Sequence, residues 1–126
     1  MADQLKWLKG GCHCGAVRFR ARSQEREAVR CNCTICTKKG FLHWIVAKDD
    51  FQLLSGSEQL SEYTFNTGVA RHLFCSVCGI HSFYVPRSHP DGFDVNVRCL
   101  DDGAREHFLI SPFDGRNWEA HVDELR

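Results

Sequence analysis

The sequence lacks both a net charge and a long apolar segment. Sixteen Lys and Arg balance sixteen Asp and Glu among the 126 residues, so the formal net charge at pH 7 is +0. Without surplus positive charge the chain lacks the attraction that dominates binding to phosphate backbones, so we do not expect a nucleic-acid partner. The longest uncharged apolar run, residues 41–47, is far shorter than the roughly 20 residues of a transmembrane helix. We therefore expect no membrane partner.

The sequence is expected to carry no secretory signal and no internal linker. Its first residues contain no sustained apolar stretch, and no low-complexity block interrupts the chain. We interpret residues 1–126 as one zinc-binding domain in a reducing compartment, either cytoplasmic or nuclear. In such a compartment the eight cysteines are expected to be thiolates rather than disulfides.

Short alternating segments predict strands. Residues 17–22 alternate apolar side chains with arginines, and residues 93–99 alternate apolar side chains with polar ones, so both are predicted to be half-buried strands. Further short segments rich in aromatic and β-branched residues are bounded by turn-forming residues. These segments are 41–48, 60–65, 69–74 and 81–85.

The end of the chain has helical spacing instead. Trp118, Val122 and Leu125 recur at intervals of four and three residues behind Asn117, which predicts a short C-terminal helix packed on the domain. The predicted fold class is therefore mostly β, made of small antiparallel sheets with one short C-terminal helix.

Two close cysteine pairs are each followed by glycine. They are Cys12 and Cys14, and Cys75 and Cys78. Tetrahedral zinc requires sulfurs about 3.8 Å apart, whereas alternate residues of a straight strand are roughly 6.6 Å apart. The chain must therefore curl, and Gly15 and Gly79 can adopt the positive φ that such a turn needs. The pairs predict a four-thiolate structural zinc site, with free thiols or a disulfide as the alternatives.

A third group, Cys31, Cys33 and Cys36, contains only three cysteines. Three protein ligands and one exchangeable position are typical of catalytic zinc. Cys99 could supply a fourth ligand, but its phase within 93–99 favours a buried thiol of the core. Other candidate fourth ligands are His43, His72 and His81.

Several motifs resemble the glutathione-dependent formaldehyde-activating enzyme family. They are "GGCHCGAVRF", "CNCTICTKKG", "CSVCG" and "CLDDG", and the likeness covers roughly residues 7–120. Within this family the chain resembles centromere protein V at "TKKG", "YTFNT" and "SFYVPRS". The resemblance implies small antiparallel sheets in a β-tent architecture around two zinc ions. The four-cysteine site would be structural, and the ion held by Cys31, Cys33 and Cys36 would be catalytic.

The resemblance also implies a reaction, in which glutathione and formaldehyde combine to S-(hydroxymethyl)glutathione or the adduct is cleaved. The protein would be a zinc-dependent carbon–sulfur lyase or synthase. A three-thiolate zinc is a poor Lewis acid and suits binding and deprotonating a further thiol. The alternative function is a non-catalytic zinc module that binds a protein or chromatin partner.

Cations beside the three cysteines are candidates for binding the carboxylates of glutathione. Arg30, Lys38 and Lys39 flank the group directly, although an exposed basic turn would have the same composition. Aromatic residues of the predicted strands could wall a pocket or belong to the core. These residues are Trp44, Phe83 and Tyr84.

Overall fold

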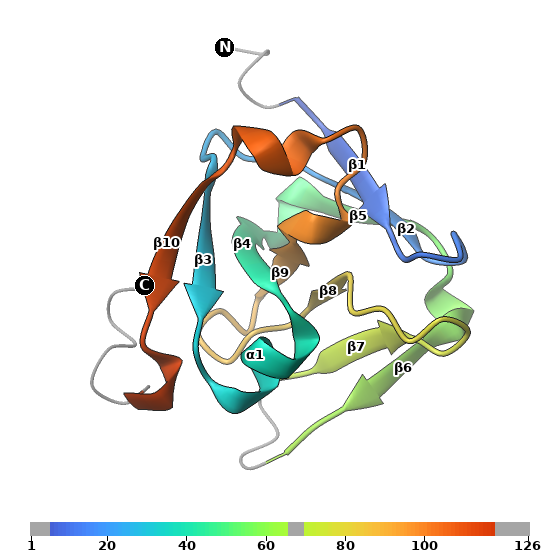
Figure 1. The fold of residues 1–126 in the computed structure, drawn as a ribbon. Helices are drawn as coiled ribbons and strands as arrows, with labels where there is room; N and C mark the ends of the chain where they lie inside the picture. Colours follow the sequence, from blue (N-terminus) through green and yellow to red (C-terminus); the bar gives the residue numbers. More distant parts are fainter. Residues whose placement is uncertain (1–5, 66–69, 118–126) are drawn as a thin grey trace.

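The computed structural model describes residues 6–65 and 70–117, which form three small sheets (Figure 1). The first sheet has the order β1 (Leu8–Gly11), β2 (Arg18–Ala21) and β5 (Phe51–Ser55). The second has the order β10 (Leu109–Phe113), β3 (Glu27–Cys31), β4 (Leu42–Ala47), β9 (Gly92–Asn96) and β8 (Phe83–Tyr84). The third pairs β6 (Leu60–Tyr63) with β7 (His72–Cys75).

Helical segments are short. The helix α1 spans Thr34–Lys39. Five 3-10 turns complete the described elements: η2 (Lys48–Asp50), η3 (Ser57–Gln59), η4 (Val97–Cys99), η5 (Ala104–His107) and η6 (Gly115–Asn117). Within the described ranges, no helix has the length and apolar composition needed to cross a lipid bilayer.

The prediction of small, mostly antiparallel sheets is confirmed. Every predicted strand segment contains an observed strand, and β10 beside β3 is the one parallel pair among the described strands. Four strands were not predicted, namely β1, β3, β5 and β10. Glycine in β1, charged residues in β3, adjacent leucines in β5 and proline in β10 interrupt a regular alternation, so alternation alone does not reveal these strands.

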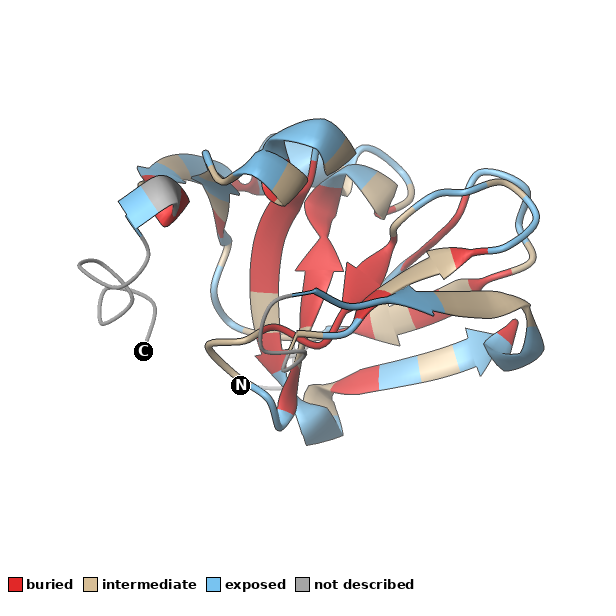
Figure 2. Ribbon diagram, turned by 90° about the horizontal axis from the view of Figure 1, so that it is seen from below, coloured by how far each residue is buried: buried red, intermediate tan, exposed pale blue. Residues whose placement is uncertain are grey.

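The core forms where the first two sheets face each other. Val17, Phe19 and Ala21 are fully buried while the intervening arginines are half-buried, as the alternation of residues 17–22 predicts. The ring of Phe19 stacks on that of Phe51 and meets Phe83 edge-on. Figure 2 shows buried residues concentrated in the central strands and exposed residues in the outer turns.

The prediction for residues 93–99 was wrong in two respects. The strand β9 ends at Asn96, and the turn η4 follows, so Cys99 is not in strand phase with Val95. Asp94 and Asn96 are also buried, at 1% and 5% exposure. Side chains of the neighbouring strands lie beside Asp94 on the same face of the sheet, namely His43 of β4 and Tyr84 of β8. Hydrogen bonds also satisfy the side chain of Asn96.

The predicted C-terminal helix lies outside the described residues. Its key positions, Trp118, Val122 and Leu125, are all among the final nine residues of the chain.

Candidate functional site

The first cysteine group joins two turns that are distant in sequence. Cys12 and Cys14 follow β1, whereas Cys75 ends β7 and Cys78 follows it. The Sγ atom of Cys14 lies 3.6 Å from that of Cys12 and 3.7 Å from that of Cys75. All four sulfurs lie within 4.8 Å of one another. These separations match the edges of a zinc–thiolate tetrahedron, about 3.8 Å.

Glycine shapes both turns, as the sequence predicts. Gly15 has φ of 83° and Gly79 has φ of 80°, values that other residues rarely adopt. The N–H of Gly79 donates to the carbonyl of Cys75 at 2.7 Å, and the N–H of Val17 donates to the sulfur of Cys12 at 3.3 Å. The curled backbone thus brings the two thiols of each cysteine pair together, and it directs the N–H group of Val17 at the sulfur of Cys12.

The pKa values of these thiols are shifted in opposite directions. Burial raises the pKa of Cys78, but backbone hydrogen bonds at Cys14 and Ile80 outweigh it and lower the pKa to about 6. A backbone hydrogen bond at Ala16 lowers the pKa of Cys14, but desolvation and the neighbouring thiols together raise it to about 11. The four thiols therefore do not all ionise by themselves at neutral pH. A divalent metal ion would compensate the repulsion between four thiolates.

The second cysteine group surrounds the start of α1. Cys31 ends β3, Cys33 is the extended residue before the helix, and Cys36 is buried within it. The helix stops after one and a half turns because Gly40 adopts φ of 67°, and its N–H donates to the carbonyls of Cys36 and Thr37. This short turn brings the three sulfurs within 4.8 Å of one another.

These three thiols are also too close to ionise together. Hydrogen bonds with Cys31 and Cys36 lower the pKa of Cys33 to about 2, and hydrogen bonds with Cys31 and Cys33 raise that of Cys36 well above its ordinary value. The described residues supply no fourth ligand atom within 4.8 Å of all three sulfurs. The group can hold a zinc ion through three thiolates and leave one position for another ligand.

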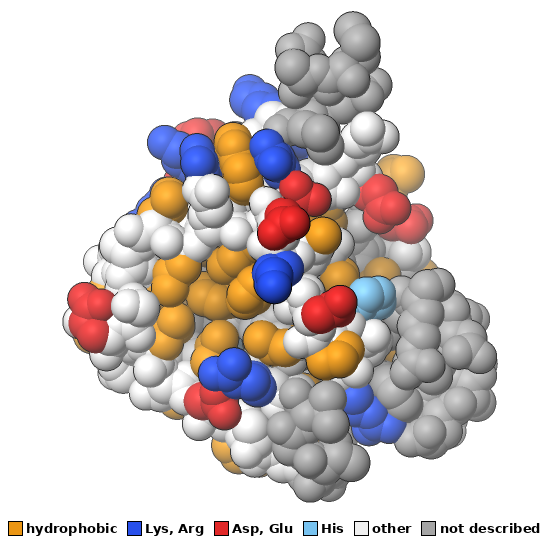
Figure 3. Space-filling model, turned by 180° about the vertical axis from the view of Figure 1, so that it is seen from behind, with side chains coloured by type: hydrophobic (Ala, Val, Ile, Leu, Met, Phe, Trp, Pro, Cys, Tyr) orange, Lys and Arg blue, Asp and Glu red, His pale blue; other side chains and the backbone are white. Residues whose placement is uncertain are grey.

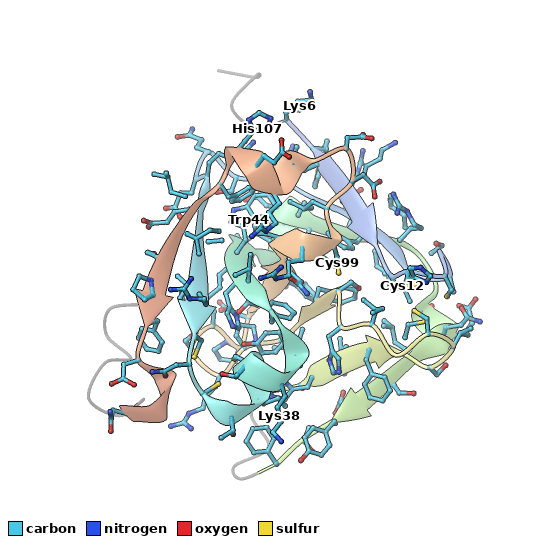
Figure 4. All side chains as sticks on the ribbon, viewed as in Figure 1. Lys6, Cys12, Lys38, Trp44, Cys99 and His107 are labelled. Atoms are coloured by element: carbon cyan, nitrogen blue, oxygen red, sulfur yellow. The ribbon has the colours of Figure 1, made fainter. Side chains whose placement is uncertain are left out.

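Cys99 belongs to neither group. It is partly buried against the hydrophobic core, and its Sγ lies 3.9 Å from the carbonyl oxygen of His81. Burial raises the pKa of this thiol to about 11, so it stays protonated at neutral pH. Figure 4 shows Cys99 at the end of η4, apart from Cys12.

A cavity of about 1040 Å³ opens beside the three-cysteine group. Its floor is one face of the second sheet, because Val29 is paired with His43 across β3 and β4, and Tyr84 with Asp94 across β8 and β9. Cys31, Cys33 and Cys36 also line it. Charged and titratable side chains of both signs line it as well: Glu25, Glu27, Lys48, Asp49, Arg87, His89 and Asp91.

Mixed charge is a feature of the wider surface too. Figure 3 shows hydrophobic side chains gathered near the middle of one face, with acidic and basic side chains interspersed around them. This mixture agrees with the zero net charge of the sequence.

The predicted cations occupy two other hollows beside the cysteines. Arg30 lines a hollow of about 640 Å³ with Cys31 and Cys36, and Lys38 and Lys39 line one of about 750 Å³ beyond α1. Lys39 turns inward, where its Nζ lies 3.1 Å from Nδ1 of His72 and 4.1 Å from the ring centre of Tyr84. Contact of Arg30, Lys38 and Lys39 with glutathione stays a prediction.

The three candidate aromatic residues have different surroundings. Phe83 packs in the core against Phe19 and Phe51. Trp44 packs edge-on against Phe108 in the core and also borders the cavity. Tyr84 lines the cavity and stacks on His72, with ring centres 4.8 Å apart.

The sequence analysis missed two features of this site. The first is a buried pair formed by His43 and Asp94, with Nδ1 and Oδ2 2.6 Å apart. The second is Gly115, which packs so tightly on the group that a Cβ atom there would overlap the sulfur of Cys31. The alternating pattern predicted that Asp94 faces solvent, and nothing in the sequence near Gly115 indicates contact with a cysteine 84 positions away.

Comparison with known proteins places the chain in a family. Residues 7–112 match the family model described as glutathione-dependent formaldehyde-activating enzyme. The chain belongs to this family. A curated Halomonas elongata protein, provisionally named as a glutathione-dependent formaldehyde-activating enzyme, is 36% identical over 80 residues. That match covers 56% of this chain and 51% of the relative, so the matched segment spans about half the length of the relative.

A solved structure supports the fold. A crystal structure of a Rhodobacter sphaeroides protein, determined as a structural-genomics target, is 33% identical and has a TM-score of 0.75. The match covers 84% of this chain and all of the other one. The family resemblance seen in the cysteine motifs is therefore confirmed by the family model and agrees with this structural match.

Proposed function

We propose that the protein binds two zinc ions and catalyses the combination of glutathione with formaldehyde, or the reverse cleavage. Cys12, Cys14, Cys75 and Cys78 would hold a structural ion, and Cys31, Cys33 and Cys36 a catalytic one. The observation that carries this proposal is the incomplete ligand set. Three sulfurs lie within 4.8 Å of one another at the side of a 1040 Å³ cavity, and no fourth ligand atom from the described residues completes the group.

Zinc bound there would lower the pKa of an incoming thiol and so favour its thiolate form. Three thiolates leave the ion with a net charge of about −1, which makes it a weak activator of carbonyl groups. The chemistry of the donor set therefore favours a thiol over an aldehyde as the exchangeable ligand. Glutathione, the thiol named in the family description, fits this preference.

Carbon–sulfur bond formation needs no redox partner. The thiol sulfur attacks the carbon of formaldehyde, the π electrons of the C=O bond move to oxygen, and that oxygen takes up the proton that the thiol gave away. Cleavage of S-(hydroxymethyl)glutathione is the same sequence in reverse. The protein must hold the thiol in place and move one proton.

The surroundings of the three cysteines suit a small zwitterionic peptide. Glutathione carries one ammonium and two carboxylate groups, and the cavity presents both acidic and basic side chains, among them Glu25, Asp49 and Lys48. Arg30, Lys38 and Lys39 remain the proposed carboxylate contacts from the neighbouring hollows.

The reaction can be followed by NMR exchange spectroscopy at equilibrium, where interconversion of free and glutathione-bound formaldehyde broadens or transfers signals. We expect the zinc-loaded protein to accelerate exchange above the spontaneous rate. Cys33→Ser should remove the acceleration, while Cys99→Ser, a matched change outside both cysteine groups, should retain it. Exchange at the spontaneous rate with zinc fully loaded would contradict catalysis and favour the non-catalytic zinc module.

A further inference from the structure

The pair formed by His43 and Asp94 leaves one histidine nitrogen without a partner. The two side chains are 8% and 2% exposed, and Nδ1 of His43 lies 2.6 Å from Oδ2 of Asp94. The other ring nitrogen, Nε2, is buried and has no hydrogen-bond partner among the described residues. A buried polar atom without a partner is rare in folded proteins and indicates a missing water, ion or ligand.

The contact with Asp94 determines the chemical state of the orphan nitrogen. When Asp94 is ionised, its carboxylate only accepts hydrogen bonds, so Nδ1 of His43 is the donor in this contact. Nε2 then presents a lone pair, which can accept a proton. The hydroxyl of Tyr84 lies 3.4 Å from the same Nδ1 and closes that side of the pair.

The sheet register places His43 beside the three-cysteine group. His43 on β4 is directly opposite Val29 on β3, and Cys31 is two residues further along β3, so its side chain is on the same face. His43, Cys33 and Cys36 all line the 1040 Å³ cavity.

His43 is nevertheless not the fourth ligand of the three-cysteine group. Its ring nitrogens do not come within 4.8 Å of all three sulfurs, which they would do as part of a zinc tetrahedron. Because it lines the same cavity as the three cysteines, it can face a molecule bound to the group without occupying the exchangeable position itself.

We propose that His43 is a catalytic residue that accepts the proton of the incoming thiol and later donates it to the oxygen of the aldehyde, with Asp94 as its positioning residue. This inference rests on the proposed function. The S–H bond breaks as Nε2 gains the proton. The C–S bond forms while the C=O π electrons move to oxygen, and Nε2–H then protonates that oxygen. The imidazole ends neutral, as it began.

Nearby charges favour this cycle. The carboxylate of Asp94 stabilises the imidazolium that forms, and a newly bound thiolate adds further negative charge. Both negative charges therefore favour transfer of the thiol proton to His43 once the thiol has bound.

The ring nitrogens of His43 can be observed directly by nitrogen-15 NMR of the zinc-loaded protein, with His43→Gln used to assign the signals. We expect a proton on Nδ1 alone in the free protein and on both nitrogens after addition of glutathione at the same pH. S-methylglutathione has no thiol proton to give and should leave Nε2 unprotonated. A ring that is unchanged by glutathione, or that carries its proton on Nε2 beforehand, would overturn the assignment.

Variants add an independent measurement. His43→Gln should lower kcat for exchange by roughly 100-fold or more while zinc content and glutathione affinity stay near wild type. Asp94→Asn should also lower kcat, because an amide no longer fixes the ring as an Nδ1 donor. His107→Gln is the matched control, since His107 is exposed and lies at the opposite end of the molecule from Lys38 (Figure 4).

The outcomes separate the two proposals. Normal glutathione binding with unchanged kcat in His43→Gln would overturn the role of His43 and leave the proposed function intact. Failure of the wild-type protein to bind glutathione would overturn the proposed function, and this inference with it.

Discussion

The sulfur atoms of Cys14 and Cys75 lie 3.7 Å apart although 61 positions separate the two residues in sequence. One residue follows the first strand of the β1–β2–β5 sheet, and the other ends a strand of the β6–β7 sheet. A zinc ion between them would therefore link two separate sheets. Such a link stabilises a fold whose individual sheets are too small to be stable alone.

Cys12→Ser is expected to prevent folding. Structural zinc sites contribute about 10–16 kcal/mol in small zinc domains, whereas the whole free energy of unfolding of a domain is about 5–15 kcal/mol. Loss of one thiolate from the four-cysteine group should therefore leave the chain unfolded or aggregated. Circular dichroism and thermal melting of the purified variant test this.

Cys99→Ala serves as the matched control for that variant. Because Cys99 lies outside both groups and packs against the core, this change should cost on the order of 1 kcal/mol and leave zinc stoichiometry unchanged. A melting curve of Cys12→Ser that matches wild type, or zinc loss in Cys99→Ala, would contradict the division of the cysteines.

The two zinc ions are expected to differ in lability. Four thiolates would enclose the first ion, whereas the second would have three thiolates and an exchangeable position, so a mild chelator should remove the second ion first. Elemental analysis during chelation should show two steps of one zinc each, with the melting temperature falling sharply only in the second. Release of all zinc in a single step would show that the sites are equivalent.

Gly115→Ala is expected to damage the three-cysteine site without unfolding the protein. An added Cβ would overlap the sulfur of Cys31 and lie 3.1 Å from Cβ of Cys33, so the cysteines must shift. Zinc affinity at this site should fall roughly 10-fold or more, as for other changes next to metal ligands. Competition with a chelator of known affinity measures the loss.

The control for Gly115→Ala lies in the same turn. Asn117 is exposed and donates a hydrogen bond to Asp114 at 2.7 Å, so Asn117→Ala perturbs η6 without approaching a cysteine. Equal zinc affinity in the two variants would show that the contact of Gly115 with Cys31 has no effect on the site.

How much the sequence revealed depended on the range of the interactions. Residues 17–22 and the glycines after the cysteine pairs were predicted correctly, because their conformations depend on local alternation and local φ. The burial of Asp94 was missed because it arises from side chains of other strands, His43 on β4 and Tyr84 on β8, which lie beside it on the same face of the sheet. Gly115 was missed because its constraint comes from a cysteine distant in sequence.

The stability of the protein should fall on mild acidification, partly because of His72. Burial, followed by the positive charge of Lys39, lowers the pKa of His72 from 6.5 to about 4 in the folded state. Between these pH values the unfolded chain binds more protons than the folded protein. The contribution of His72 to stability is therefore lost as the pH falls from about 6.5 to about 4.

His72→Gln should flatten this pH dependence, and His107→Gln, at an exposed position, should not. Urea unfolding of both variants at several pH values between 4 and 7 measures the slope. Part of the slope will remain in His72→Gln, because burial also lowers the pKa of His81 to about 4. An identical slope in His72→Gln and wild type would show that His72 does not titrate in this way.

The central claim is that the three-cysteine zinc receives a thiol, and calorimetry with two ligands tests it most directly. S-methylglutathione keeps both carboxylates and the ammonium of glutathione but cannot form a thiolate, so the comparison isolates the metal–sulfur bond from the ionic contacts. The zinc-loaded protein should bind glutathione at least about 10-fold more tightly than S-methylglutathione, and Cys33→Ser should abolish the difference. Equal affinity for the two ligands, or binding of neither, would contradict the claim.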